Sequence, residues 1–142
     1  MTDNDSLDEA STHQAPSPES PSTELFNRGQ HVFMGEVTME TMKPLIDWII
    51  AENYNKHKRK KELTLGICSP GGDLNACFAL VDVMKGSKIP IRTIGMGMIA
   101  SCGLLMFISG TKGKRILLQI LQYYLINIHG AHTEKNTNYL LK

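Results

Sequence analysis

The chain has 142 residues, the length of one domain, and its 42% hydrophobic content is sufficient for a packed core. Its three cysteines are an odd number in apolar surroundings, which excludes a disulfide framework and favours a reducing, cytoplasmic environment. The net charge is only +1, but residues 1–24 contain six acids and no Lys or Arg, which leaves +7 for the remainder. The acidic amino terminus is unlike a signal or transit peptide. No histidine has a Cys or acid partner at metal-ligand spacing, and His129 and His132, three residues apart, lie in the aberrant carboxyl-terminal segment, so we expect no metal and no cofactor.

Residues 1–24 are rich in Ser, Thr, Pro, Asp and Glu and contain almost nothing to bury. Such a segment cannot offset the entropy lost on ordering, so we expect a disordered, solvated tail. A flexible arm for a partner and a removable pro-segment are the alternatives. We expect an α/β domain over residues 25–117 and an aberrant segment over residues 118–142.

The first predicted elements are a short strand over residues 31–34 and a helix over about residues 39–55. Thr38 or Glu36 can begin this helix. Trp48 lies near the edge of the apolar stripe, so it fits either the core or a subunit contact. The helical spacing predicts burial of Met42, Leu45, Ile46, Ile49 and Ile50.

A basic run at residues 56–61 follows the helix. It could form a nucleic-acid patch, which is one alternative function for the chain. The run contains no interleaved aromatic residue, and cations also suit the end of a helix. We therefore expect a solvated loop and no nucleic-acid partner.

Two further strands enclose the next helix. The apolar run at residues 63–68 predicts a buried strand, which Ser69-Pro-Gly-Gly72 ends sharply. A helix over residues 74–85 and a strand over residues 89–95 follow. The apolar stripe predicted for this helix consists of Leu74, Cys77, Phe78, Val81 and Met84.

The stretch from Thr93 to Gly110 has no charged side chain and organises the rest of the chain. We expect a buried strand that ends at Gly95, a tight turn, and a helix that begins at Ser101. A membrane span is the alternative, but the stretch is barely long enough and is rich in Gly and Ser. A basic turn and a strand over residues 115–118 complete the pattern.

Alternating strands and helices predict an α/β fold with a mainly parallel sheet. In such sheets ligands bind at the carboxyl ends of the strands, where both Gly-rich turns are expected to meet. Ser101 then lies at a helix amino terminus, where free N–H groups favour negative charge. That arrangement suits a nucleophile beside an oxyanion site, whereas Cys102, Ser69 and Ser109 suit packing roles.

Five motifs in fixed order resemble those of the proteolytic subunit of the Clp protease. They lie between Val32 and Leu117 and are Phe33-Met-Gly-Glu36, Cys68-Ser-Pro-Gly-Gly72, Asp82-Val-Met84, Thr93-Ile-Gly-Met-Gly-Met-Ile-Ala-Ser101 and Gly110-Thr-Lys-Gly-Lys-Arg115. The resemblance implies a ClpP/crotonase-like fold, a spiral of repeated strand-strand-helix units with a mainly parallel sheet. We expect this fold to be incomplete at the carboxyl terminus.

The resemblance also implies a role for each matching residue. Ser101 would be the nucleophile, the N–H groups of Gly72 and Cys102 would form the oxyanion hole, and Gly71 would shape the turn. The family cuts unfolded polypeptides inside two stacked heptameric rings fed by an ATP-dependent unfoldase. We therefore expect a serine endopeptidase that self-associates into rings and acts on unfolded polypeptides. We expect no association with a membrane.

The expected general base falls in a segment that departs from the family pattern. The candidate is His129, because a serine nucleophile needs an imidazole to accept its proton. The family places Pro-Asn before an apolar strand and His-Gln, whereas here Pro-Asn is missing and Gly130 follows the histidine. The only acid after Ser101 is Glu134, and nothing in the sequence shows that it reaches the imidazole.

We hypothesise that a frameshift near Leu117 accounts for this departure. Read one base out of frame, with allowed codons, the segment can spell Thr-Pro-Asn-Thr-Ser-Ile-Leu-Ser-His-Gln, which is the family pattern. The shifted histidine spans the codons of Leu125 and Ile126. The nucleotide sequence tests this hypothesis, which predicts little or no peptidase activity for the present chain.

Two alternatives share the fold. One is a non-catalytic subunit that stabilises a mixed ring, which the retention of Ser101 disfavours. The other is a crotonase-like protein that binds acyl-CoA thioesters in a similar oxyanion hole. Neither alternative explains both Gly turns together with Ser101.

Overall fold

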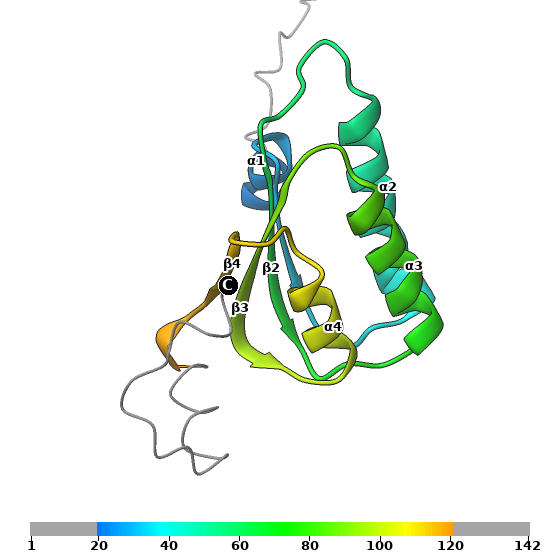
Figure 1. The fold of residues 1–142 in the computed structure, drawn as a ribbon, viewed down its shortest axis with the longest axis vertical. Helices are drawn as coiled ribbons and strands as arrows, with labels where there is room; N and C mark the ends of the chain where they lie inside the picture. The colour runs from blue at the N-terminus through cyan, green and yellow to red at the C-terminus, as the bar shows by residue number, and fades with distance from the viewer. Residues whose placement is uncertain (1–19, 121–142) are drawn as a thin grey trace, which may run out of the picture.

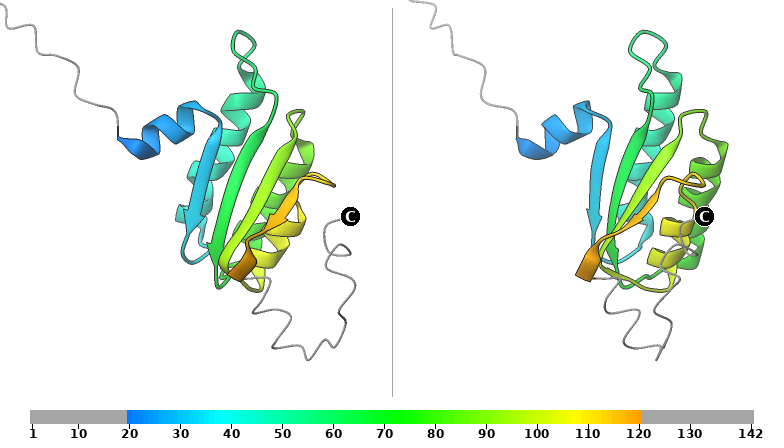
Figure 2. Two further views of the ribbon diagram at one scale, coloured as in Figure 1. Left: turned by 90° about the vertical axis from the view of Figure 1, so that its left-hand side faces the viewer. Right: turned by 60° about the vertical axis from the view of Figure 1, so that its left-hand side comes forward.

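The computed structural model describes residues 20–120, which form a parallel four-stranded sheet in the order β1-β2-β3-β4. Figures 1 and 2 show helices α2, α3 and α4 on one face of this sheet. The α/β class with a parallel sheet, predicted from the sequence, is confirmed. In chain order the elements are α1 (Pro21–Asn27), β1 (Gln30–Met34), α2 (Met39–Tyr54), β2 (Leu63–Ser69), α3 (Leu74–Gly86), β3 (Ile91–Ile99), α4 (Cys102–Ile108) and β4 (Arg115–Leu117).

The two faces of the sheet differ in their environment. Phe33 pairs with Ile67 and Ile67 with Gly95, and both side chains are buried on the helix-covered face. Val32 pairs with Gly66 and Gly66 with Ile94 on the opposite face. There Val32 is 46% exposed and Met34 is 69% exposed, so this face keeps apolar groups at the surface.

The amino-terminal boundary of the fold differs from the predicted one. Ser20 caps α1, because its hydroxyl accepts a hydrogen bond from the Thr23 N–H at 3.3 Å, and Pro21 occupies the first helical position. The boundary predicted at residue 24 is therefore wrong, and residues 20–24 belong to α1. Phe26 anchors the helix, since its ring centroid lies 5.5 Å from that of Trp48. The rest of the predicted tail, residues 1–19, lies outside the described residues.

Helix α2 confirms most of the prediction for its stretch. Thr38 and Thr41 form a reciprocal capping box at its start. Trp48 is only 2% exposed, so it belongs to the core of this chain. Ile50 was predicted to be buried but is 41% exposed, because it lies about 100° around the helix from the buried Ile49.

The face that α3 buries was predicted only in part. Cys77 and Met84 are buried as expected, but Leu74 is 50% exposed and Phe78 is 48% exposed. Ala76 and Leu80 are buried in their place. The helix has apolar residues on two overlapping stripes, and packing against the neighbouring elements buries the stripe that contains Ala76 and Leu80.

Strand β3 is longer than predicted. It does not end at Gly95 but continues to Ile99, because two extra residues are accommodated opposite β2. Ile67 pairs with Gly95, and the next pair joins Ser69 to Ile99. Gly97, with a φ of 64°, allows this irregularity, which resembled a turn in the sequence. No helix within residues 20–120 is long and apolar enough to cross a membrane.

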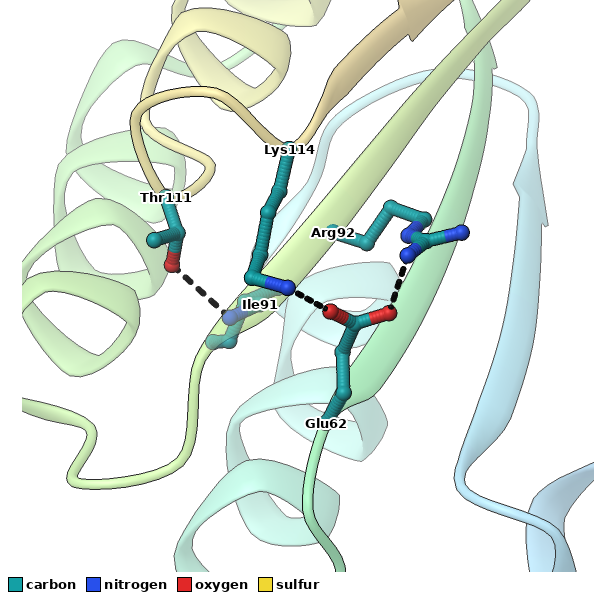
Figure 3. Close-up of polar contacts among 5 residues, drawn as sticks. All are labelled: Glu62, Ile91, Arg92, Thr111 and Lys114. Carbon is teal, nitrogen blue, oxygen red and sulfur yellow. Dashed lines mark hydrogen bonds and ion pairs between the residues drawn. The ribbon is translucent and has the colours of Figure 1, made fainter.

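Glu62 joins three strands at the amino-terminal edge of the sheet. Its carboxylate lies 2.8 Å from Arg92 of β3 and also bonds Lys114, which precedes β4 (Figure 3). Thr111 supports the same turn, because its hydroxyl accepts the Ile91 N–H at 2.9 Å. The hydrogen bond from Lys114, followed by the charge of Arg92, holds the pKa of Glu62 below its usual 4.5 against the opposing effect of burial.

Replacing Glu62 with Gln should lower the free energy of unfolding at pH 7 by about 1 kcal/mol, since partly exposed networks contribute little more. Because the folded pKa is depressed, the charged pairs stabilise the protein fully above pH 4.5 and lose this effect as the pH falls through the folded pKa. Urea unfolding of Glu62→Gln and wild type at pH 7 and near pH 4 measures the change. Asp82→Asn, at an exposed site without an ion pair among residues 20–120, is the control. A difference that does not shrink at acid pH would contradict the prediction.

Candidate active site

The two Gly-rich turns meet at the carboxyl edge of the sheet, as predicted. The Ala100 N–H after β3 donates to the Ser69 carbonyl at the end of β2, at 3.0 Å. A Cβ atom placed on Gly71 would lie 2.8 Å from Ser101 Cβ and 3.1 Å from Cys102 N. Only a residue without a side chain permits this approach, so Gly71 brings the first turn directly against Ser101.

Ser101 has the backbone of a strained strand-to-helix turn. Its φ of 50° and ψ of −120° make it the one non-glycine residue within 20–120 with positive φ. It is exposed and precedes α4 as the N-cap, but its side chain makes no capping hydrogen bond. A serine on such a turn projects its hydroxyl away from the sheet, where a substrate can reach it. The helix therefore begins one residue later than predicted.

Two amide groups beside Ser101 have no acceptor among residues 20–120. The Val37 N–H donates to Gly71 O at 2.8 Å, and the Asp73 N–H donates to Val37 O at 2.7 Å. This parallel bridge uses the groups on either side of Gly72 and leaves the Gly72 N–H free. Cys102 is the first residue of α4, so its N–H has no acceptor within the helix. Two free donors beside a hydroxyl can stabilise an oxyanion.

Ser69 and Val37 hold the first turn in place. Ser69 is fully buried, and its hydroxyl accepts the Gly71 N–H at 3.1 Å. A Cβ atom on Gly103 would lie 2.7 Å from Ser69 O, so α4 packs closely on the same residue. The structural role predicted for Ser69 agrees with these contacts. The role of Val37 was missed, because it depends on backbone hydrogen bonds that no side-chain pattern indicates.

The two cysteines near the site are buried between α3 and α4. Cys102 Sγ donates to Gly72 O at 3.4 Å, and Cys77 Sγ donates to Cys102 O at 3.5 Å. Burial, with a further contribution from the neighbouring Cys102, raises the pKa of the Cys77 thiol to about 12. A protonated, buried thiol is a poor nucleophile, which supports a packing role for Cys77.

Alkylation with iodoacetamide at pH 8 should therefore distinguish the cysteines. Cys68, which is partly exposed, should react at least about tenfold faster than Cys77 and Cys102 in the folded protein. In urea, where burial is lost, the three rates should converge. Mass spectrometry of the alkylated peptides measures each rate, and rapid modification of Cys102 in the folded state would contradict the packing role.

The predicted base is not placed by the structure. His129 and Glu134 lie outside the described residues, so the structure does not test their distance from Ser101. Within residues 20–120, no hydrogen bond joins Ser101 to an imidazole or a carboxylate, and no three His, Cys, Asp or Glu side chains form a group that could hold a metal ion. The described site therefore consists of a serine and two amides.

A parallel α/β sheet with an exposed, strained serine beside two free amides defines a site suited to carbonyl chemistry. The sequence model of the Clp protease family matches residues 17–138. Because this match covers most of the sequence, the chain belongs to the Clp protease family. The ClpP-like fold expected from the sequence motifs is consistent with the observed architecture.

Individual relatives match a shorter stretch. The ATP-dependent Clp protease proteolytic subunits of Streptococcus pyogenes serotype M5 (strain Manfredo) and Streptococcus thermophilus (strain ATCC BAA-491 / LMD-9) are each 43% identical to the chain over 65 residues. These residues make up 46% of the present chain and 33% of each relative. The match thus spans a third of the length of these relatives.

Proposed function

We propose that the chain is a serine-type endopeptidase subunit of a Clp-like protease. Ser101 attacks the peptide carbonyl, and the N–H groups of Gly72 and Cys102 donate hydrogen bonds to the carbonyl oxygen, which stabilise the negative charge that develops on it. The close approach of Gly71 to Ser101 carries the proposal: a Cβ atom built on Gly71 would lie 2.8 Å from Ser101 Cβ and 3.1 Å from Cys102 N, so the first turn lies directly beside the serine. The names of the relatives and the family match support the same chemistry.

The reaction needs a proton acceptor in addition to the serine and the amides. His129 is the candidate base of the chain as it stands, and it would take the Ser101 proton during attack and return it to the leaving amine. No residue is assigned as the acid that should orient the imidazole. A hydroxyl without an activated base is a weak nucleophile, so we propose slow acylation and little or no turnover in this chain.

The relatives are named ATP-dependent Clp protease proteolytic subunits. By analogy, we propose that the present chain associates with other subunits in a ring and receives unfolded polypeptides from an ATP-driven unfoldase. The exposed apolar side chains of the uncovered sheet face, including Val32 and Met34, fit a protein that is partly covered in an assembly. Native mass spectrometry of the chain mixed with an active relative tests whether it enters a ring. The labelling experiment below then tests whether a ring subunit of this kind has a reactive serine.

A biotinylated fluorophosphonate should modify Ser101 and no other serine. The expected adduct is absent from Ser101→Ala and present in the control Ser109→Ala, whose hydroxyl lies at the other end of α4 and bonds Leu105 O at 2.7 Å. Peptide mapping by mass spectrometry identifies the modified residue. Cleavage of a short fluorogenic peptide should be equal for wild type and Ser101→Ala. Adduct on another residue, or none after prolonged incubation, would contradict the proposed nucleophile.

A further inference from the structure

The positive charges of the chain gather at the amino-terminal edge of the sheet. Three segments, residues 55–62, 87–92 and 111–115, hold ten of the fifteen Lys and Arg residues and a single acid, Glu62. They lie before and at the first residues of β2, β3 and β4, and parallel pairing brings the starts of these strands to one edge. We call this surface the basic edge. Its cations are Lys56, Lys58, Arg59, Lys60, Lys61, Lys88, Arg92, Lys112, Lys114 and Arg115.

Contacts between the three segments make the basic edge continuous. The Arg59 guanidinium donates to the Lys88 carbonyl at 3.4 Å, which joins the first two segments. Glu62 joins Arg92 to Lys114, which connects the second and third segments (Figure 3). Lys60 pairs with Glu52 of α2 at 3.0 Å. Only two carboxylates therefore neutralise any of the ten cations among residues 20–120.

The remaining cations have no such compensation. Lys56, Lys58, Lys61 and Lys88 are exposed and make no ion pair within residues 20–120. Like charges on adjacent loops repel one another and raise the local positive potential. An anionic segment that binds there would relieve the repulsion and gain several Coulomb interactions at once.

The acidic amino-terminal segment joins the fold at this same end. Figure 2 shows α1 beside the amino end of β1, at the end of the sheet that carries the loop between α2 and β2. A Cβ atom on Gly29, just after α1, would lie 2.4 Å from Lys60 Cδ, so the two segments touch. Residues 1–19 contain five acids and no Lys or Arg. Extended, nineteen residues reach about 60 Å, which is ample to cross the edge.

We propose that residues 1–19 bind the basic edge of their own chain as an acidic strap. The acids involved are Asp3, Asp5, Asp8, Glu9 and Glu19. Covalent connection gives such a segment an effective concentration on the order of millimolar, so weak pairs suffice for occupancy. The strap competes with external polyanions for these lysines, and this role is independent of the chemistry proposed for Ser101.

Zero-length carbodiimide crosslinking of the full chain tests the strap. In about 25 mM salt, acids of residues 1–19 should couple to Lys56, Lys58 and Lys61, and the yield should fall by about tenfold or more in 0.5 M salt, where screening is strong. Lys43 is the control amine, because it is 72% exposed and lies at the start of α2, near the opposite edge. An equimolar mixture of ¹⁴N and ¹⁵N protein separates coupling within one chain from coupling between copies.

Each outcome of the crosslinking experiment either supports or overturns the strap. Coupling within one chain to the basic-edge lysines supports the strap. Coupling between copies would overturn it in favour of an intermolecular contact. Equal coupling to Lys43, or no coupling from residues 1–19, would overturn it in favour of a solvated segment.

A binding assay that does not depend on crosslinking provides the second measurement. Converting the five acids to Asn or Gln removes the competitor. A fluorescent twenty-nucleotide oligothymidylate should then bind this five-acid variant several-fold more tightly than it binds wild type, as measured by fluorescence anisotropy. Replacing Lys56, Lys58 and Lys61 with Ser in addition should abolish the gain. The charge control carries Glu36→Gln, Glu40→Gln and Asp82→Asn, which raise the net charge outside the segment. Equal affinity for wild type and the five-acid variant, or an equal gain in the charge control, would overturn the strap and leave the edge open to polyanions.

Discussion

Replacing Gly72 with Ala should destabilise the protein by more than about 3 kcal/mol, because backbone strain and a steric clash each contribute about 1–3 kcal/mol. The φ of Gly72 is 148°, a conformation that residues with a side chain rarely adopt. The added Cβ atom would lie 2.2 Å from Val37 O and 2.9 Å from Val37 N. Both are backbone atoms, so the clash can be relieved only by breaking the bridge between Val37 and Gly72. Urea unfolding followed by the fluorescence of Trp48, the one tryptophan, measures the loss.

Gly86 provides a matched control for this substitution. It is the last residue of α3, and a Cβ atom placed there meets nothing within 4 Å. Gly86→Ala should leave stability unchanged or raise it by up to about 1 kcal/mol, the usual difference between Gly and Ala in a helix. Equal stability of Gly72→Ala and Gly86→Ala would show that the turn beside Ser101 is not fixed by the Val37 bridge.

Restoring the family pattern after Leu117 should increase the reactivity of Ser101 by about 100-fold or more, the smallest contribution typical of a positioned general base. The variant replaces residues 118–127 with Thr-Pro-Asn-Thr-Ser-Ile-Leu-Ser-His-Gln, the sequence that the shifted frame can spell with allowed codons. The rate of fluorophosphonate modification measures the gain, and Ser101→Ala in the same background should abolish it. We do not expect the full rate of an intact Ser-His-Asp triad, since no Asp is identified in the variant that would orient the restored histidine.

The control for this variant carries the same ten residues with Gln in place of His. It should modify Ser101 no faster than wild type, because it restores the strand pattern without the base. If both versions react alike, the gain comes from the fold and the assignment of the histidine is wrong. If wild type already reacts rapidly and His129→Gln abolishes the reaction, His129 is the base and the frameshift hypothesis loses its functional support.

The order of the elements from β1 to β4 and the position of the candidate nucleophile could be predicted from the sequence, whereas helix α1 was missed. Short apolar runs separated by Gly turns and amphipathic helices indicated a parallel α/β sheet, and this pattern depends on local composition. Ser101 followed from its place between an apolar strand and an apolar helix. The convergence of both Gly turns also followed, because parallel strands must place their carboxyl ends at one edge.

The sequence could not predict which apolar stripe of α3 faces inward or where β3 ends. Leu74 and Phe78 are as apolar as the residues that are buried, so only packing against neighbouring elements selects Ala76 and Leu80. Gly95 and Gly97 resemble a turn in isolation. Pairing of Ile99 with Ser69 extends the strand, and this pairing depends on residues thirty positions away.

By itself, the sequence determined that a serine follows the third strand and that Gly71 and Gly72 follow the second. Tertiary structure decided that Gly71 lies against Ser101 and that the Gly72 amide has no acceptor among residues 20–120. The physical reason lies in the hydrogen bonds of the bridge to Val37. They use the Gly71 carbonyl and the Asp73 N–H, and no hydrogen bond of the bridge uses the N–H of Gly72. Val37, thirty-five residues before Gly72, accepts from Asp73 and donates to Gly71, so the Gly72 N–H between them stays unused by the bridge, as the proposed oxyanion site requires.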